Sequence, residues 1–339
     1  MPNSVRHNEF RSERRFGIEL EMGDEIKKKT VHAAISSKSK YKVYCSKYAL
    51  TSNNNYWHVK DDATCGRSGR LGPKGVEVAS FIGSGLDDLN HVLEIATHLS
   101  SIGCKVNQNC GLHIHAEVVD LTTEQVAVLV AYWIKIEMLL SMILPLCRYQ
   151  NEYCKFLFSP FHNILHKNAS ISRNIKYSAL DFWERIAPKN LSLFENTDRR
   201  FNLNLVNVAR SIEINTSNRK TLELRWPEGT LNEDDIFGWV VLFLSFIETC
   251  KNLDMPDNLY PCDLRQVFDY LGIGHKKSAF MILGEKLHRM KSWMCEKIIK
   301  NCDDSSNFYA HFRTIGFQKA NVKEAKLVLN EMWSPIKKF

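Results

Sequence analysis

The chain has 339 residues, 44% of them hydrophobic and 24% charged, and a formal net charge of +7. Such a chain can bury a sizeable core, which excludes an intrinsically disordered protein and predicts two units, or one large domain with an appendage. The modest positive charge favours anionic ligands such as nucleotides in a general way, but by itself it does not indicate nucleic-acid binding.

The ten cysteines include no Cys-x-x-Cys pair, so neither a zinc knuckle nor a disulfide scaffold is predicted. Reduced thiols in a cytosolic compartment are the simpler interpretation. The N-terminus lacks the apolar stretch of a signal peptide. The longest apolar run, Val126 to Leu146, is broken by Lys135 and Glu137, which favours a buried helix over a membrane span. We therefore expect a soluble cytoplasmic protein without a membrane partner.

The first predicted strand, Phe16 to Met22, reads FGIELEM and is followed by a Lys-, Ser- and Asn-rich surface excursion as far as Asn55. A second strand, Tyr56 to Lys60, runs into Asp61 and Asp62. An Asp pair after a strand is typical of an ordinary turn, and this interpretation is at least as good as a functional role for Asp61 or Asp62.

A Gly- and Arg-rich loop from Gly66 to Pro73 precedes the strand Val76 to Ser80. Because the loop does not end in Gly-Lys-Ser/Thr, it is not a Walker motif. Glu77 shares its strand face with Gly75 and Ala79. These small neighbours leave room for a metal ion or ligand beside the Glu77 carboxylate.

Helices are predicted from apolar spacing and capping patterns. Gly103 is a typical helix C-terminal stop for the first helix, and Thr122 with Gln125 forms a capping-box pattern for the second. The main predicted helices are Leu86 to Ile102, Thr122 to Cys147, Ser178 to Ile186 and Asn232 to Cys250. This arrangement of strands and helices predicts an α+β fold, residues 1–250, with a helical C-terminal extension, residues 251–339.

Three short ribbons each carry a polar pair at i, i+2 on an otherwise apolar strand: Phe16 to Met22, Cys110 to Ala116 and Thr221 to Trp226. Since strand side chains alternate between faces, each pair lies on one face and the apolar residues on the other. A lone pair of this kind is usually a solvated strand face. The three pairs together are Glu19 with Glu21, His113 with His115, and Glu223 with Arg225. Side by side, they would line a cavity with metal ligands and one fixed cation.

The order of these motifs, with Gly75-x-Glu-x-x-Ser80 after the first and Gly229-Thr-Leu231 after the last, resembles the amidoligase family. The match runs from about Phe16 to Cys250. That family belongs to the glutamine synthetase-like carboxylate–amine ligases. The resemblance implies a curved, mostly antiparallel sheet with helices on one face. It also implies an ATP-dependent ligase that forms an amide or isopeptide bond through an acyl phosphate, with Mg²⁺ or Mn²⁺.

The resemblance also implies roles for individual residues. Glu19, His113 and Glu223 would hold the phosphate-side ion, and Glu21 and Glu77 would belong to the set for a second ion. His115, Arg199 and Arg200 would bind the nucleotide, with Arg200 as the γ-phosphate clamp. Arg225 would meet the carboxylate or the departing phosphoryl group, and Asp61 or Asp62 would lie at the substrate pocket. Arg225, Arg200 and Glu77 are thus the candidate catalytic residues.

Arg148, Asn151 and Tyr153 also resemble a family pattern, although Arg148 is equally consistent with an ordinary cation at a helix C-terminus. Two other functions stay open: a metal-dependent hydrolase, since His-x-His is also a zinc pattern, and an inactive binding module on the same fold. The carboxylate donor and amine acceptor, whether small molecules, peptides or modified bases, stay open too, as do the number of metal ions and the oligomeric state.

Overall fold

The computed structural model describes residues 13–23, 26–45, 55–66, 73–145, 148, 151–157, 178–186, 200–215, 220–260, 262, 264–271, 293–294 and 297. Most of the predicted C-terminal extension and the tip of the Gly- and Arg-rich loop lie outside these residues. No helix in this part of the chain combines the length and the apolar character that a membrane crossing requires.

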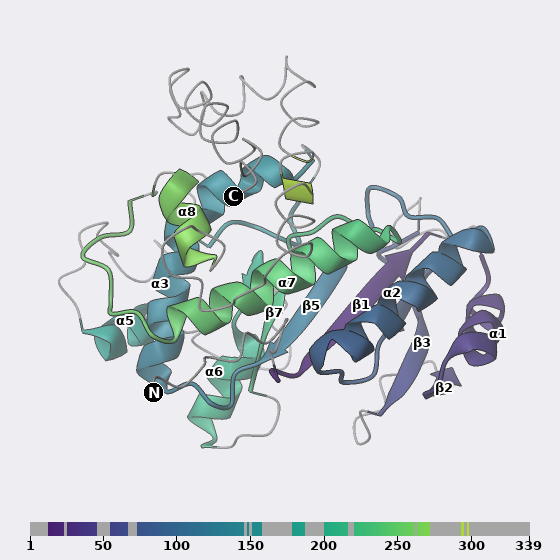
Figure 1. Cartoon of the computed structure of the whole chain (residues 1–339), viewed down its shortest axis with the longest axis horizontal. Helices are drawn as coiled ribbons and strands as arrows, with labels where there is room; N and C mark the ends of the chain where they lie inside the picture. The colour runs from purple at the N-terminus through teal and green to yellow at the C-terminus, as the bar shows by residue number, and fades with distance from the viewer. Residues whose placement is uncertain are drawn as a thin grey trace, which may run out of the picture.

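One open sheet of seven strands runs through the molecule (Figure 1). Its order is β2-β3-β4-β1-β5-β7-β6, and every neighbouring pair is antiparallel except β2 with β3. The strands are β1 (Phe16–Met22), β2 (Lys42–Cys45), β3 (Tyr56–Asp62), β4 (Gly75–Ala79), β5 (Leu112–Glu117), β6 (Leu203–Asn204) and β7 (Thr221–Leu224). The prediction of an α+β fold with a mostly antiparallel sheet is confirmed.

The three polar ribbons become β1, β5 and β7, which are neighbours in the centre of this sheet. Ile18, Leu20 and Ile114 on the apolar face are each at most 1% exposed. Helices α2 (Gly85–Ser101) and α7 (Glu233–Cys250) lie over this face (Figure 1), and together with the sheet they form one hydrophobic core. The buried helices therefore leave the opposite, polar face of the sheet for the site.

The remaining helices pack around this core. They are α1 (Lys28–Lys38), α3 (Thr123–Leu140), α5 (Ala179–Ile186), α6 (Val206–Glu213) and α8 (Leu264–Tyr270), with a 3-10 turn η2 (Ser141–Ile143) after α3. Helix α1 lies within the segment that was predicted only as a surface excursion. This helix was not predicted because its sequence is weakly amphipathic, with just Val31 and Ile35 buried.

The predicted caps form at two helix starts. Thr122 and Gln125 exchange reciprocal hydrogen bonds between side chain and backbone, and the Asn232 side chain accepts the N–H groups of Asp234 and Asp235. The helix predicted to run to Cys147 instead ends as α3 at Leu140. Leu144, which precedes Pro145, is extended, as expected from the clash that a proline imposes on the residue before it.

Part of the chain beyond Cys250 packs back onto α7. The Trp293 ring lies 5.5 Å from that of Trp239, and a Cβ atom at Gly238 would approach the Trp293 ring to 2.4 Å. Trp293 Nε1 donates to Asp235 Oδ1 at 2.9 Å, and Lys297 pairs with both Asp235 and Glu228. These contacts tie Trp293 and Lys297 to the first half of α7 and to the segment before it.

Candidate functional site

The polar face of the sheet is the floor of a cavity of about 670 Å³. Residues of six strands, β1, β3, β4, β5, β6 and β7, line this cavity, and Arg148, residues 151–153, Arg200 and Asn207 also line it. The lining residues include Glu19, Glu21, Lys60, Asp62, Glu77, Gly111, His113, His115, Arg148, Tyr153, Arg200, Asn204, Glu223 and Arg225. Both carboxylates and cations therefore converge on one cavity.

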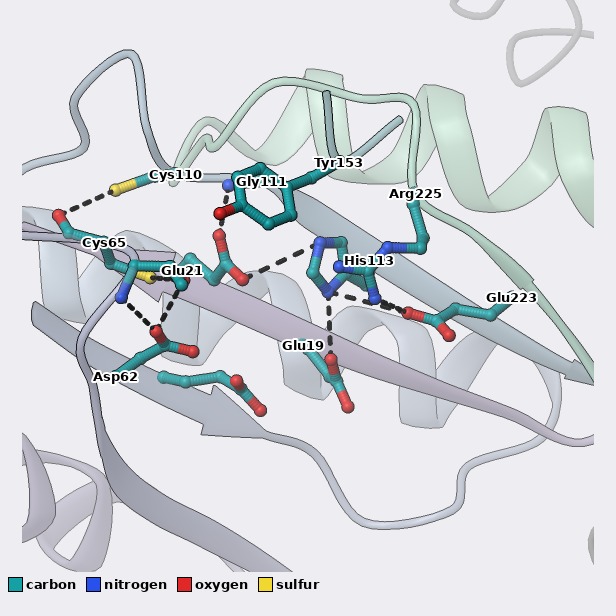
Figure 2. A network of polar contacts seen from close by, with 12 residues as sticks. Glu19, Glu21, Asp62, Cys65, Cys110, Gly111, His113, Tyr153, Glu223 and Arg225 are labelled. Carbon is teal, nitrogen blue, oxygen red and sulfur yellow. Dashed lines mark hydrogen bonds and ion pairs between the residues drawn. The ribbon is translucent and has the colours of Figure 1, made fainter. Parts of the chain in front are cut away.

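Glu19, His113 and Glu223 line this cavity and point toward one another (Figure 2), with one ligand atom of each within 4.8 Å of the others. His113 Nδ1 lies 3.0 Å from Glu19 Oε2 and 3.8 Å from Glu223 Oε1. Strand register explains the convergence, because Glu19 is opposite His113 on β5 and Glu223 is opposite His115. Three residues far apart in the sequence thus share one side of three adjacent strands.

Both carboxylate oxygens of Glu223 have a donor. Arg225 Nη1 lies 2.5 Å from Oε1, and Asn204 Nδ2 donates to Oε2 at 2.6 Å. Burial raises the pKa of Glu223, but the charges of His115 and Arg225 lower it, and the net shift is downward. Glu223 is therefore an anion at neutral pH, as a metal ligand must be.

His115 lies beside the same two carboxylates, with Nε2 3.3 Å from Glu19 Oε1 and 4.0 Å from Glu223 Oε1. Burial lowers the pKa of His115, but the charges of Glu223 and Glu19 outweigh burial and raise the pKa to about 9. A protonated His115 would place positive charge beside Glu19 and Glu223, where the family resemblance predicts a nucleotide phosphate.

Glu21 accepts the backbone N–H of Gly111 at 2.6 Å, and its other oxygen lies 3.7 Å from His113 Nε2. A Cβ atom at position 111 would lie 2.8 Å from His113 Nε2 and 3.4 Å from Glu21 Oε2. Glycine is therefore required for the imidazole to pack this closely against the chain. Gly111 lies two residues before the His-x-His pair in the ribbon Cys110 to Ala116, and the sequence pattern alone indicated no role for it.

Glu77 is opposite both Glu21 on β1 and Lys60 on β3, and Lys60 Nζ lies 2.6 Å from Glu77 Oε1. Burial and the charge of Glu19 raise the pKa of Glu77 well above its usual value, although Lys60 acts in the opposite direction. Lys60 was missed in the sequence. Its position two residues before Asp62, on the same strand face, was the available signal.

The two aspartates that follow the β3 motif point in different directions. Asp62 lines the cavity and accepts the N–H of Thr64 at 2.6 Å. Asp61, on the other face, is exposed and pairs with Lys28 at 2.6 Å. Of the two residues expected at the substrate pocket, the structure therefore brings only Asp62 to the cavity.

A second group of ligand atoms, within 4.8 Å of one another, consists of Glu21, Asp62 and Cys65. The sequence had placed Glu21 and Asp62 in different roles, and it had assigned none to Cys65. Cys65 is fully buried beside Gly75. A Cβ atom placed on Gly75 would lie 2.5 Å from the Cβ of Cys65. Gly75 is opposite Asp62, the last residue of β3, and Cys65 follows that strand by three residues, so no strand pattern in the sequence pairs the two.

Arg200 lines the cavity, and its guanidinium lies 5.2 Å from the centre of the Tyr153 ring, the geometry of a cation–π contact. Arg199 lies outside the described residues. Arg148 is 3% exposed and donates to backbone carbonyls of the strand ends, so it is not an ordinary cation at a helix terminus.

A family model described as "Putative amidoligase enzyme" matches residues 12–247. The matched range includes every cavity residue named above. A search of curated proteins found no match.

Proposed function

Because the chain belongs to this amidoligase family, we propose that it is an ATP-dependent carboxylate–amine ligase that forms an amide or isopeptide bond through an acyl phosphate. The observation that carries the proposal is the cluster of Glu19, His113 and Glu223 with Arg225 bonded to one member of it. This combination of metal-ligand atoms and a guanidinium suits the handling of phosphoryl groups.

An unactivated carboxylate does not react with an amine, because its oxygen is a poor leaving group. Transfer of the ATP γ-phosphoryl group to that oxygen makes a good leaving group, which the amine then displaces as phosphate. Such a transfer asks the protein mainly for positioning and for neutralisation of negative charge. A bound divalent ion supplies much of that neutralisation.

The donor set fits such an ion. Glu19 and Glu223 offer hard carboxylate oxygens, which Mg²⁺ prefers, and the imidazole of His113 is better suited to Mn²⁺. We propose Glu21 as a ligand of a second ion, with Glu77 or Asp62 completing the set. The Lys60–Glu77 pair favours Asp62 as the partner, because Lys60 already holds an oxygen of Glu77.

Arg225 bonds the same oxygen of Glu223, Oε1, that lies 3.8 Å from His113 Nδ1. Coordination of an ion by this oxygen would compete with the guanidinium. The released fork would then be free to bind two oxygens of the substrate carboxylate or of the departing phosphoryl group.

The remaining residues are assigned by charge and place. His115 would contact the nucleotide phosphates, and Arg200, at the cavity wall beside Tyr153, would clamp the γ-phosphate. Glu77 is proposed as a further catalytic carboxyl group, since a buried acid with a raised pKa in a cavity is a frequent mark of proton transfer.

The proposal is tested by incubating the protein with ATP, Mg²⁺ and a panel of carboxylates and amines, followed by mass spectrometry. The expected product has the summed mass of one acid and one amine less one water, and it forms with release of ADP and phosphate. Glu223→Gln should give no product under the same conditions. Breakdown of a substrate without ATP would instead favour a metal-dependent hydrolase, and ligand binding without turnover would favour an inactive module.

A further inference from the structure

We propose that Arg148 is a positioning residue, which orients Arg225 and the Gly111 amide by holding the backbone on both sides of the site. It does so by bonding Arg225 and Trp226, which follow β7, and Cys110, two residues before β5. Only the turnover part of the test below rests on the proposed ligase function.

The contacts of Arg148 join two segments that are remote in the sequence. Nη2 donates to Arg225 O at 2.7 Å, Nε to Trp226 O at 3.0 Å and Nη1 to Cys110 O at 3.5 Å. All three acceptors are backbone carbonyls, and the side chain is buried. A planar guanidinium with five N–H donors can span acceptors in this way, whereas an ammonium group cannot match the geometry.

The first consequence concerns Arg225. Its backbone N–H donates to Asn202 O at 2.8 Å, and its carbonyl accepts from Arg148. The chain leaves the sheet at this point, since β7 ends at Leu224. Without the bond from Arg148, the backbone of Arg225 would be held on one side only, and its side chain would start from a less defined position.

The second consequence concerns one peptide plane. The carbonyl of Cys110 and the N–H of Gly111 belong to the same planar unit, and in a trans peptide they point in opposite directions. Arg148 and the Gly229 N–H bond the carbonyl, while Glu21 accepts the N–H. Fixing the carbonyl end therefore fixes the direction of the N–H that holds Glu21.

Arg148 is itself anchored at the end of the α3 region. Its N–H donates to Pro145 O at 3.0 Å, and its carbonyl accepts from the Asn151 N–H at 3.4 Å and the Cys154 thiol at 3.5 Å. The guanidinium is thus a link between the segment after α3 and the two strand ends that carry Arg225 and Gly111.

The test uses Arg148→Lys, with Arg15→Lys as the matched control, because Arg15 is an exposed arginine that pairs with Glu117 at the far end of β5. Backbone hydrogen exchange is measured at Gly111 and Gly229. We expect exchange at both amides to speed up about tenfold or more in Arg148→Lys and to stay unchanged in Arg15→Lys. Unchanged exchange in a folded Arg148→Lys variant would overturn the proposal.

Turnover gives a second readout. Misplacement of a catalytic group by about 1 Å costs on the order of 10²-fold in rate, so kcat of Arg148→Lys should fall by that order while KM for ATP changes little. A large rise in KM with kcat preserved would make Arg148 a substrate-binding cation and overturn the positioning role. If the wild-type protein ligates nothing, the ligase proposal fails, while the exchange measurement still decides the role of Arg148.

Arg148→Gln is the second variant if Arg148→Lys does not fold, because its amide can still donate to one of the carbonyls. Partial restoration of slow exchange at Gly229, relative to Arg148→Ala, would support the role. If no substitution at position 148 folds while Arg15→Lys does, Arg148 is a purely structural residue and the proposal is wrong.

Discussion

Glu19 and His113 lie directly opposite each other on β1 and β5, with Glu19 Oε2 3.0 Å from His113 Nδ1, although 94 residues separate them in the chain. Antiparallel pairing of the two strands brings their polar faces to the same side. Glu223 enters from β7 on the other side of β5. The cluster is thus a property of strand register, and a shift by one residue would turn either side chain to the opposite face.

Removal of one carboxylate from this cluster should weaken metal binding. We expect Glu19→Gln or Glu223→Gln to lower the Mn²⁺ affinity by at least about tenfold. Loss of a residue that only supports a metal ligand already lowers metal affinity by about this factor, and a ligand itself should matter at least as much. Isothermal titration calorimetry measures the affinity. Glu117→Gln is the control, because Glu117 lies on β5 but pairs with Arg15. Equal affinity in all three variants and the wild type would show that no ion binds at this cluster.

Arg225→Lys should abolish most ligase turnover while sparing the fold. Loss of one clamp on the transition state costs on the order of 3–4 kcal/mol, or about two to three decades in kcat. A mere ion pair with Glu223 would tolerate lysine. ATP-dependent ligation by the purified variant, with thermal melting to verify folding, distinguishes these outcomes, and turnover near that of the wild type would remove Arg225 from the mechanism.

Gly111→Ala should disturb the site where Gly17→Ala does not. A Cβ at Gly111 meets His113 Nε2 at 2.8 Å, whereas a Cβ at Gly17 meets only His115 Cβ at 4.0 Å. Forcing a methyl group into such packing costs about 1–3 kcal/mol. We expect urea unfolding to show this loss for Gly111→Ala alone, with weaker Mn²⁺ binding. A similar loss in both variants would place the cost in the backbone rather than in the imidazole contact.

His91 should make stability fall at acid pH. It is 7% exposed, near the rings of Tyr41, Trp57 and Phe81. Burial, aided by the charge of Lys40, lowers its pKa in the folded state below the usual 6.5, although Glu94 and Asp88 act in the opposite direction. The unfolded chain therefore binds a proton more readily. The contribution is present above about pH 6.5 and is lost as the pH falls through the lower, folded pKa.

The pH effect is measured as the difference in free energy of unfolding between the wild type and His91→Gln from pH 8 to pH 5. The wild type should lose stability relative to the variant as the pH decreases. His98→Gln, a less buried position on the same helix, is the control. A difference that stays constant with pH would show that the pKa of His91 is the same in the folded and the unfolded chain.

Much of the fold could be predicted because its signals are local. Strand alternation gave the two faces of β1, β5 and β7, and the capping patterns at Thr122 and Asn232 gave two helix starts. The parts that could not be predicted depend on partners that the pattern does not specify. Lys60 acquires its role from lying opposite Glu77, and Asn204 from donating to Glu223.

The same limit applied to the site. Periodicity placed Glu19, His113 and Glu223 on the polar faces, but only strand order makes them neighbours. Asp61 and Asp62 were equivalent as sequence, and the alternation of β3 directs just one of them into the cavity. The role of Gly111 could not be predicted for another reason. The requirement for glycine at this position becomes evident only once the position of the His113 ring is known.

The packing of Trp293 against Gly238 has a practical consequence for protein production. A version shortened to residues 12–247 would include Gly238 but not the Trp293 ring that packs against it. Asp235 would also lose its partners Trp293 and Lys297. Such a protein would expose Trp239 beside an empty groove, the kind of apolar patch that promotes self-association. Size-exclusion chromatography should find the shortened form in higher-order species and the 339-residue chain in a single, well-defined peak.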